Sequence, residues 1–196
     1  MKNIKYIVLS LLISVVFSCE NEELDALRSQ GNEDSGPLPE LTAGTADFST
    51  YVSIGNSLTA GFSDGTVFLA AQENSFPTIL SQQFNLVGGG SFTQPLVNDN
   101  FGGLALAGDR IPGFRVRLVT LGGPPTSIES VIGPVTVSTD IVSNNPSGPF
   151  NNMGVPGATS FHLTAPGYGN IANLEAGLAN PYFIRMTGAW LFYTSP

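Results

Sequence analysis

The stretch Tyr51-Val52-Ser53-Ile54-Gly55-Asn56-Ser57-Leu58-Thr59-Ala60-Gly61-Phe62 decides the fold that we expect for this chain. Its apolar first part favours a short buried strand that ends at Gly55. The polar residues that follow can cap the first free amides of a helix. Ser57 would then stand at the carboxyl end of a strand, where open α/β sheets bind ligands, with the positive end of a helix behind it. This position suits a nucleophile, although a serine there is also a common helix N-cap.

A second informative stretch runs from residue 150 to residue 159 and reads Phe-Asn-Asn-Met-Gly-Val-Pro-Gly-Ala-Thr. It reads Asn-x-Gly-x-x-Gly from Asn152 to Gly157, and the glycine at position 154 would let the backbone approach a neighbouring atom closely. The alternative is a tight turn with Pro156-Gly157 at its corner. The local sequence leaves both interpretations open.

Together the two stretches resemble the signature blocks of the SGNH (GDSL) hydrolases. Gly55-Asn56-Ser57-Leu58-Thr59 resembles the first block, Gly-Asp-Ser-Leu-Thr, with Asn56 in place of the usual Asp. The resemblance implies a flavodoxin-like, three-layer α/β fold, with Ser57 as the nucleophile and the Ser57 and Gly154 amides as oxyanion donors. It further implies Asn56 and Asn152 as substrate-binding residues, and no cofactor.

The chain departs from the family in its last third. The family's Gly-x-Asn-Asp and Asp-x-x-His blocks are missing, although the resemblance otherwise covers residues 48–183. His162 is the only histidine, and its place just after the second block argues against a role as the base. We therefore expect a truncated SGNH domain, because the later parallel strands are not evident. Loss of the base implies low or no turnover.

The first 18 residues have the proportions of a secretory signal peptide, with Lys2 and Lys5 before an apolar run that is too short to span a bilayer. The run ends at Ser18-Cys19, which resembles a bacterial lipobox with Cys19 as the lipid anchor. The alternative is ordinary cleavage that leaves one free thiol. The lipobox implies an exported outer-membrane lipoprotein on the periplasmic or cell-surface side.

Residues 19–47 are expected to form an acidic linker. They contain eight acidic residues and one arginine, so they carry most of the formal net charge of −8. Such a segment stays solvated and extended. The acidity argues against nucleic-acid binding, which needs clustered Lys and Arg. One histidine and one cysteine also cannot build a metal site.

Residues 48–196 are expected to form one domain. The spacing of the apolar residues predicts an amphipathic helix over Phe76–Phe84. The sequence of residues 86–148 predicts loops and a small β-rich insertion, with strand-like runs at 114–119 and 135–138. The triplet Gly88-Gly89-Gly90 in this region lacks the spacing of a phosphate loop. Three arginines of this region, at positions 110, 115 and 117, could meet an anionic substrate, although solvated strand residues are the simpler interpretation.

Two functions remain open from the sequence. The first is a lipid-anchored serine esterase or lipase that acts on carboxylic esters of lipids or acylated glycans, in this chain truncated or inactive. The second is a non-catalytic surface lipoprotein that binds a glycan or a protein partner through its glycine-rich loops.

Overall fold

Two segments far apart in the sequence form a parallel strand pair. The computed structural model describes residues 40–143 and 145–187, and every element named here belongs to the unit formed by residues 41–196. Strand β1 (Ser53–Gly55) runs parallel to β8 (Asn152–Gly154), with Gly55 opposite Gly154. Parallel neighbours end at the same edge of a sheet, so the loops after both strands leave on the same side.

The other described strands are two residues long and form antiparallel pairs. They are β2 (Phe62–Ser63) with β3 (Thr66–Val67), β4 (Ala105–Leu106) with β5 (Asp109–Arg110), and β6 (Leu118–Val119) with β7 (Thr126–Ser127). Asp64-Gly65 and Ala107-Gly108 connect the first two pairs, and all four residues have positive φ. Two central residues with positive φ make the type I′ turn, which matches the twist of a hairpin.

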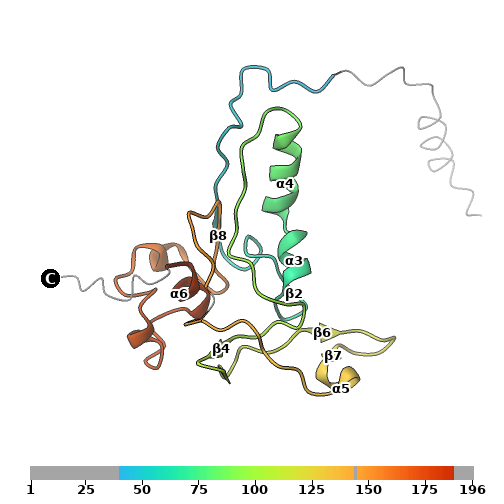
Figure 1. The fold of residues 1–196 in the computed structure, drawn as a ribbon, viewed down its shortest axis with the longest axis vertical. Coiled ribbons are helices and arrows are strands. Elements are labelled where there is room, and N and C mark those ends of the chain that lie inside the picture. Colours follow the sequence, from blue (N-terminus) through green and yellow to red (C-terminus); the bar gives the residue numbers. More distant parts are fainter. Residues whose placement is uncertain (1–39, 144, 188–196) are drawn as a thin grey trace, which may run out of the picture. The chain divides into compact units, whose positions relative to one another are not determined.

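Few helices accompany these strands. They are α3 (Leu69–Glu73), α4 (Phe76–Asn85), α5 (Glu129–Ile132) and α6 (Pro181–Thr187), with 3-10 turns η1 (Ser160–Thr164) and η2 (Ile171–Asn173). Helix α4 confirms the helix expected over Phe76–Phe84 to within one residue. The described part of the chain is therefore a mixed α/β structure with small sheets (Figure 1).

The expected strands of the insertion are only partly present. Within 114–119 the structure has the two-residue strand β6, and Val116 makes an isolated bridge to Gly102. Residues 135–138 form no strand, although the chain just beyond them pairs with β4, since Ala105 bonds to both Thr139 and Ile141. The alternation of apolar and polar residues over 114–119 correctly located a strand, but only a short one. The surrounding chain is rich in glycine and proline, which do not sustain long strands.

Aromatic contacts fix the segment that leads into β1. The Phe48 ring stacks on Phe84 of α4 with the centroids 4.7 Å apart, and Tyr51 meets the same ring edge-on at 5.1 Å. Tyr51 also stacks on Phe92, in the chain that returns from α4. Figure 1 shows the three segments running alongside one another.

Asn180 and Pro181 fix the start of helix α6. Asn180 Oδ1 accepts the Tyr182 amide at 2.9 Å, and Pro181 occupies the first helical position, where proline is favoured. The Asn180 side chain also donates to the Pro156 carbonyl at 2.9 Å. One asparagine thus caps the helix and ties it to the turn after β8.

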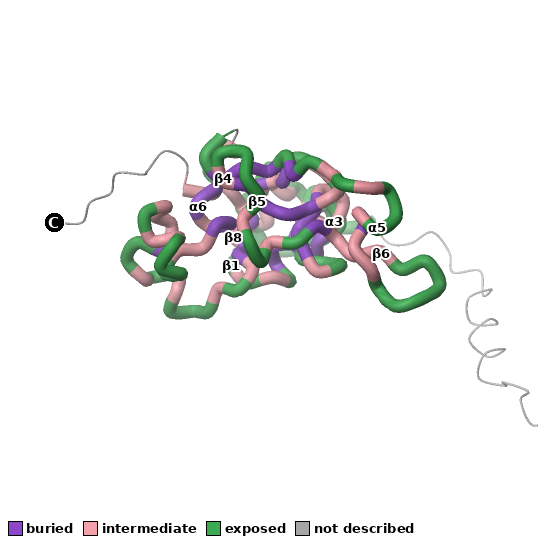
Figure 2. Tube along the Cα trace, turned by 90° about the horizontal axis from the view of Figure 1, so that it is seen from below, coloured by how far each residue is buried: buried purple, intermediate pink, exposed green. Residues whose placement is uncertain are grey.

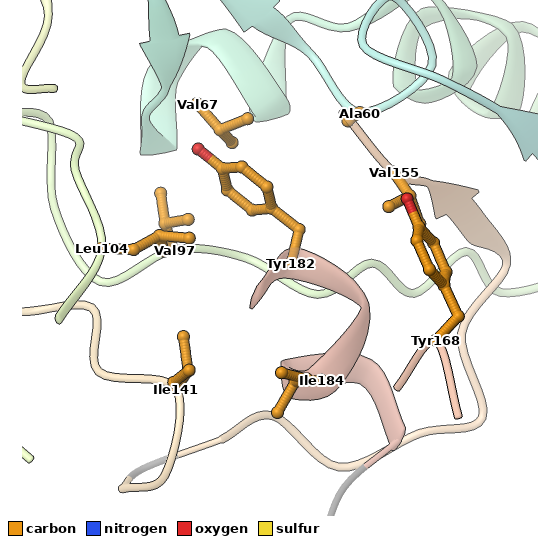
Figure 3. Close-up of a cluster of buried hydrophobic side chains, with 9 residues drawn as sticks. All are labelled: Ala60, Val67, Val97, Leu104, Ile141, Val155, Tyr168, Tyr182 and Ile184. Carbon is orange, nitrogen blue, oxygen red and sulfur yellow. The ribbon is translucent and has the colours of Figure 1, made fainter. Parts of the chain in front are cut away.

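The main core lies between α6, the loop after β8 and the β2–β3 hairpin (Figure 3). Tyr182 of α6 reaches between Val67 and Leu104, and Tyr168 lies beside Val155. The most buried members of this core are 0–2 % exposed: Val67, Leu104, Ile141, Val155 and Ile184.

A smaller core lies in the insertion. It consists of Ala105, Val116, Ile128 and Val137, each under 9 % exposed. Figure 2 shows that the buried stretches are short and that the hairpin tips are exposed.

Apolar residues just before β1, within β1 and in α4 are more exposed than the sequence predicts. Val52 and Ile54 are 50 % and 64 % exposed, and Leu58 in the following turn is 74 % exposed. In α4, Phe76 and Ile79 are nearly half exposed, whereas Pro77 and Ser81 are buried. The expected burial of this strand was wrong for Val52 and Ile54, because a sheet of two strands offers little surface to cover them.

A matched pair of substitutions tests this burial pattern. Val52→Thr should change the free energy of unfolding by less than about 0.5 kcal/mol, because the side chain already meets water. Val155→Thr should cost about 2 kcal/mol, because it places a hydroxyl in the main core at a position that is 0 % exposed. Equal effects in urea unfolding would contradict the burial described here.

An ion pair joins β5 to α5 within the insertion. Arg110 of β5 makes a bidentate contact with Glu129 of α5 at 2.6 and 3.0 Å and also donates to the Val135 carbonyl. Glu129 accepts the Val135 amide at 2.9 Å. The bond from Arg110, with a smaller contribution from the amide, lowers the pKa of Glu129 from 4.5 to about 2.

This depressed pKa predicts a pH-dependent stability. The ionised Glu129 stabilises the fold above pH 4.5, and this contribution is lost as the pH falls toward 2. The unfolding free energies of the wild type and Glu129→Gln should therefore differ at pH 7 and converge in acid. The exposed Glu175 makes no hydrogen bond in the described ranges, so Glu175→Gln is the control and should show little difference at either pH.

Candidate active site

The turn that carries Ser57 follows β1 directly. The Ala60 amide donates to the Asn56 carbonyl at 3.0 Å, and the Phe62 amide donates to the Ser57 carbonyl at 2.9 Å. The chain therefore makes one helical turn and then enters the β2–β3 hairpin. The helix expected directly behind Ser57 is reduced to this single turn in the described residues, so a helix dipole contributes little here.

Gly55 and Thr59 make this turn tight. Thr59 is 5 % exposed and folds back onto β1, where a Cβ at position 55 would lie 2.1 Å from Thr59 Oγ1. Ser57 itself is half-buried, and its hydroxyl has no hydrogen-bond partner in residues 40–143 and 145–187. The Ser57 and Leu58 amides also lack a partner within these ranges, as expected at the start of a turn.

Asn152 joins β8 to the Ser57 turn. It is 2 % exposed, and its Nδ2 donates to the Thr59 carbonyl at 2.8 Å and to Gln94 Oε1 at 3.3 Å. Its Oδ1 accepts the Gly154 amide at 3.0 Å. Both ends of this side-chain amide are therefore bonded to the protein, so a contact with substrate, as predicted for Asn152, would require these bonds to open.

Gly154 packs against the backbone of the same turn. A Cβ at this position would lie 2.2 Å from the Ala60 nitrogen and 2.5 Å from the Thr59 carbonyl carbon. The two sequence blocks thus meet at Gly154. Its role as an oxyanion donor stays a prediction, and it requires Asn152 to release the amide.

The next loop contains a second glycine amide, which the sequence interpretation did not single out. The Ala158 amide donates to the Val155 carbonyl at 3.0 Å, and Gly157 has a φ of 80°. Proline followed by such a glycine makes a type II turn, as the alternative interpretation of this stretch held. Gly157 is exposed, and its amide has no partner among the residues described, so it is a free donor at the same edge as Ser57.

His162 lies in η1 and is engaged locally. Its Nδ1 accepts the Thr159 amide at 3.1 Å and contacts Thr159 Oγ1 at the same distance. The ring stacks on Tyr168 with the centroids 4.5 Å apart. No histidine or carboxylate is hydrogen-bonded to the Ser57 hydroxyl in the part of the chain that the structure describes.

The structure does not test the roles predicted for Asn56 and Cys19. Asn56 is exposed, and its side chain makes no hydrogen bond to the described residues. Cys19 lies outside the described residues, so the lipid anchor stays a prediction. Across residues 40–143 and 145–187, no three His, Cys, Asp or Glu side chains are close enough to hold a metal ion, and no helix is long and apolar enough to cross a membrane.

No family model, curated protein or solved structure matches this chain.

Proposed function

We propose that this chain follows the plan of an SGNH/GDSL serine hydrolase, with a flavodoxin-like arrangement of its parallel strands. In this proposal Ser57 is the nucleophile toward carboxylic esters of lipids or acylated glycans. The observation that carries the proposal is the parallel pairing of β1 with β8, which sets Gly55 opposite Gly154. Because of this pairing, the Ser57 loop and the glycine-containing loop after β8 leave the same edge, where α/β sheets bind substrates.

The proposed reaction is acyl transfer through a serine ester. Ser57 Oγ attacks the ester carbonyl carbon, the Ser57 and Gly157 amides donate to the developing oxyanion, and the alcohol leaves with the hydroxyl proton. Water then hydrolyses the acyl-serine, which releases the acid and restores Ser57. Gly154 is the further donor if Asn152 releases its amide.

The absence of a base bonded to Ser57 in the described residues supports the second function. A serine without a general base is a weak nucleophile at neutral pH. A surface lipoprotein that binds a glycan or protein partner needs no such base.

A fluorophosphonate probe tests the choice between the two functions. We expect slow labelling of the wild-type protein, loss of labelling in Ser57→Ala, and unchanged labelling in Ser63→Ala, which removes an exposed serine of the following hairpin. Ser57→Ala should fold normally, because it removes no hydrogen bond between described residues. A folded wild-type protein that takes up no label would favour the binding protein over the hydrolase.

A further inference from the structure

A cavity of about 600 Å³ lies beside the two loops of the candidate site. Phe62, which follows the Ser57 turn, forms part of one wall, and Pro156-Gly157 forms part of another. Gly157, whose amide has no partner among the described residues, is therefore a lining residue of this cavity.

Aromatic rings give the cavity its apolar surface. Phe62 is 38 % exposed, and Phe114 meets Tyr182 edge-on with the ring centroids 5.7 Å apart. Tyr182 is 7 % exposed, and Figure 3 shows its ring among the side chains of the main core. Pockets of this size that are lined by aromatic side chains suit an apolar ligand with a ring or a short chain.

Arg115 is the charged group on this cavity, and its guanidinium is available. It is exposed and makes no hydrogen bond or ion pair within residues 40–143 and 145–187. By contrast, Arg110 pairs with Glu129, and the Arg117 guanidinium lies 5.2 Å from the centre of the Phe68 ring.

Two polar residues that line the cavity, Thr66 and Asn180, already use their side chains in hydrogen bonds within the protein. Thr66 Oγ1 accepts the Gly103 amide at 3.2 Å. The Asn180 side chain bonds to Pro156 and Tyr182, as described above. An anionic ligand would therefore find its partner in Arg115, whose planar guanidinium fits a carboxylate or phosphate through two parallel bonds.

We propose that this cavity selects anionic esters, in which an apolar ring or chain lies against Phe62, Phe114 and Tyr182 and a carboxylate or phosphate binds Arg115. This inference names the substrate class of the proposed hydrolase and so rests on that function. Because Arg115 is exposed, its contribution is modest and weakens as salt rises.

Calorimetric titration of the full-length Ser57→Ala protein tests the inference without any turnover. The probes are 1-naphthyl phosphate, 1-naphthoate and the neutral 1-naphthol. We expect at least one anion to bind about 10-fold more tightly than naphthol. Adding Arg115→Ala should remove this difference, and adding Arg115→Lys should keep part of it. The better of the two anions tells whether the natural ester carries a phosphate or a carboxylate.

Arg110→Gln is the matched control, because it removes an arginine that lies outside this cavity, and the anion preference should survive it. Three results would overturn the inference: equal affinity for all three probes, an anion preference that persists in Arg115→Ala, or no binding to protein that circular dichroism shows to be folded. Failure of the hydrolase proposal is distinguishable, since it appears as absent fluorophosphonate labelling whatever the titration gives.

Discussion

Gly154→Ala should destabilise the protein by about 4 kcal/mol, more than any other variant in this series. The added Cβ would lie 2.2 Å from the Ala60 nitrogen and 2.7 Å from the Ala60 Cα. These are backbone atoms, so no rotamer change relieves the clash. The turn that carries Ser57 must move, or β8 must separate from it.

Gly123→Ala is the matched control for this substitution. A Cβ at position 123 would meet nothing within 4 Å, so stability should change by less than about 1 kcal/mol. Urea unfolding followed by circular dichroism measures both variants. Comparable small effects would mean that the Ser57 turn does not pack on Gly154.

Asn152→Ala should have the second largest effect, a loss of about 3 kcal/mol. It leaves the Thr59 carbonyl and the Gly154 amide without their partner, and each buried unsatisfied group costs about 1–3 kcal/mol. Asn152→Asp keeps the acceptor for Gly154 but turns a carboxylate oxygen toward the Thr59 carbonyl. Burial and this repulsion raise the pKa of the new carboxyl, so the loss of stability should be largest at neutral pH and smaller in acid.

Asn98→Ala is the control for the asparagine series. Asn98 is exposed, and its side chain donates a single bond, to the Ser138 carbonyl at 2.7 Å. Its loss should cost about 1 kcal/mol or less and should not depend on pH. If Asn152→Asp were as stable as the wild type at pH 7, the bond from Asn152 to Thr59 would not exist in solution.

The sequence predicted the parts of the fold that depend on local pattern. The 3.6-residue spacing of Phe76, Ile79 and Leu80 located α4, and Gly55 marked the end of a short strand. Other elements also carry local sequence signals. Asp64-Gly65 is a hairpin turn signature, and Asn180-Pro181 is a helix start.

Other features depend on the three-dimensional partners of a residue and could not be read from its neighbours. The Asn152 side chain donates to the Thr59 carbonyl and also accepts the Gly154 amide. The spacing of Asn152 and Gly154 in the sequence does not show these two bonds. The exposure of a side chain also depends on partners that are distant in the sequence. Ile54 has the sequence context of a buried strand, but it is 64 % exposed because the sheet is small. The three arginines of the insertion were equivalent in sequence, and their partners alone separate Arg115 from the others.

The parallel pairing of residues 53–55 with residues 152–154 is the claim on which the candidate site depends, and nuclear Overhauser effects test it most directly. The pairing predicts cross-peaks between backbone protons of the two segments, in the register that sets Gly55 opposite Gly154 and includes the Val155 amide, which donates to the Gly55 carbonyl at 3.0 Å. If residues 53–55 instead gave cross-peaks to another segment, or none across strands in folded protein, Ser57 and the loop after β8 would not share an edge and the proposed site would not exist.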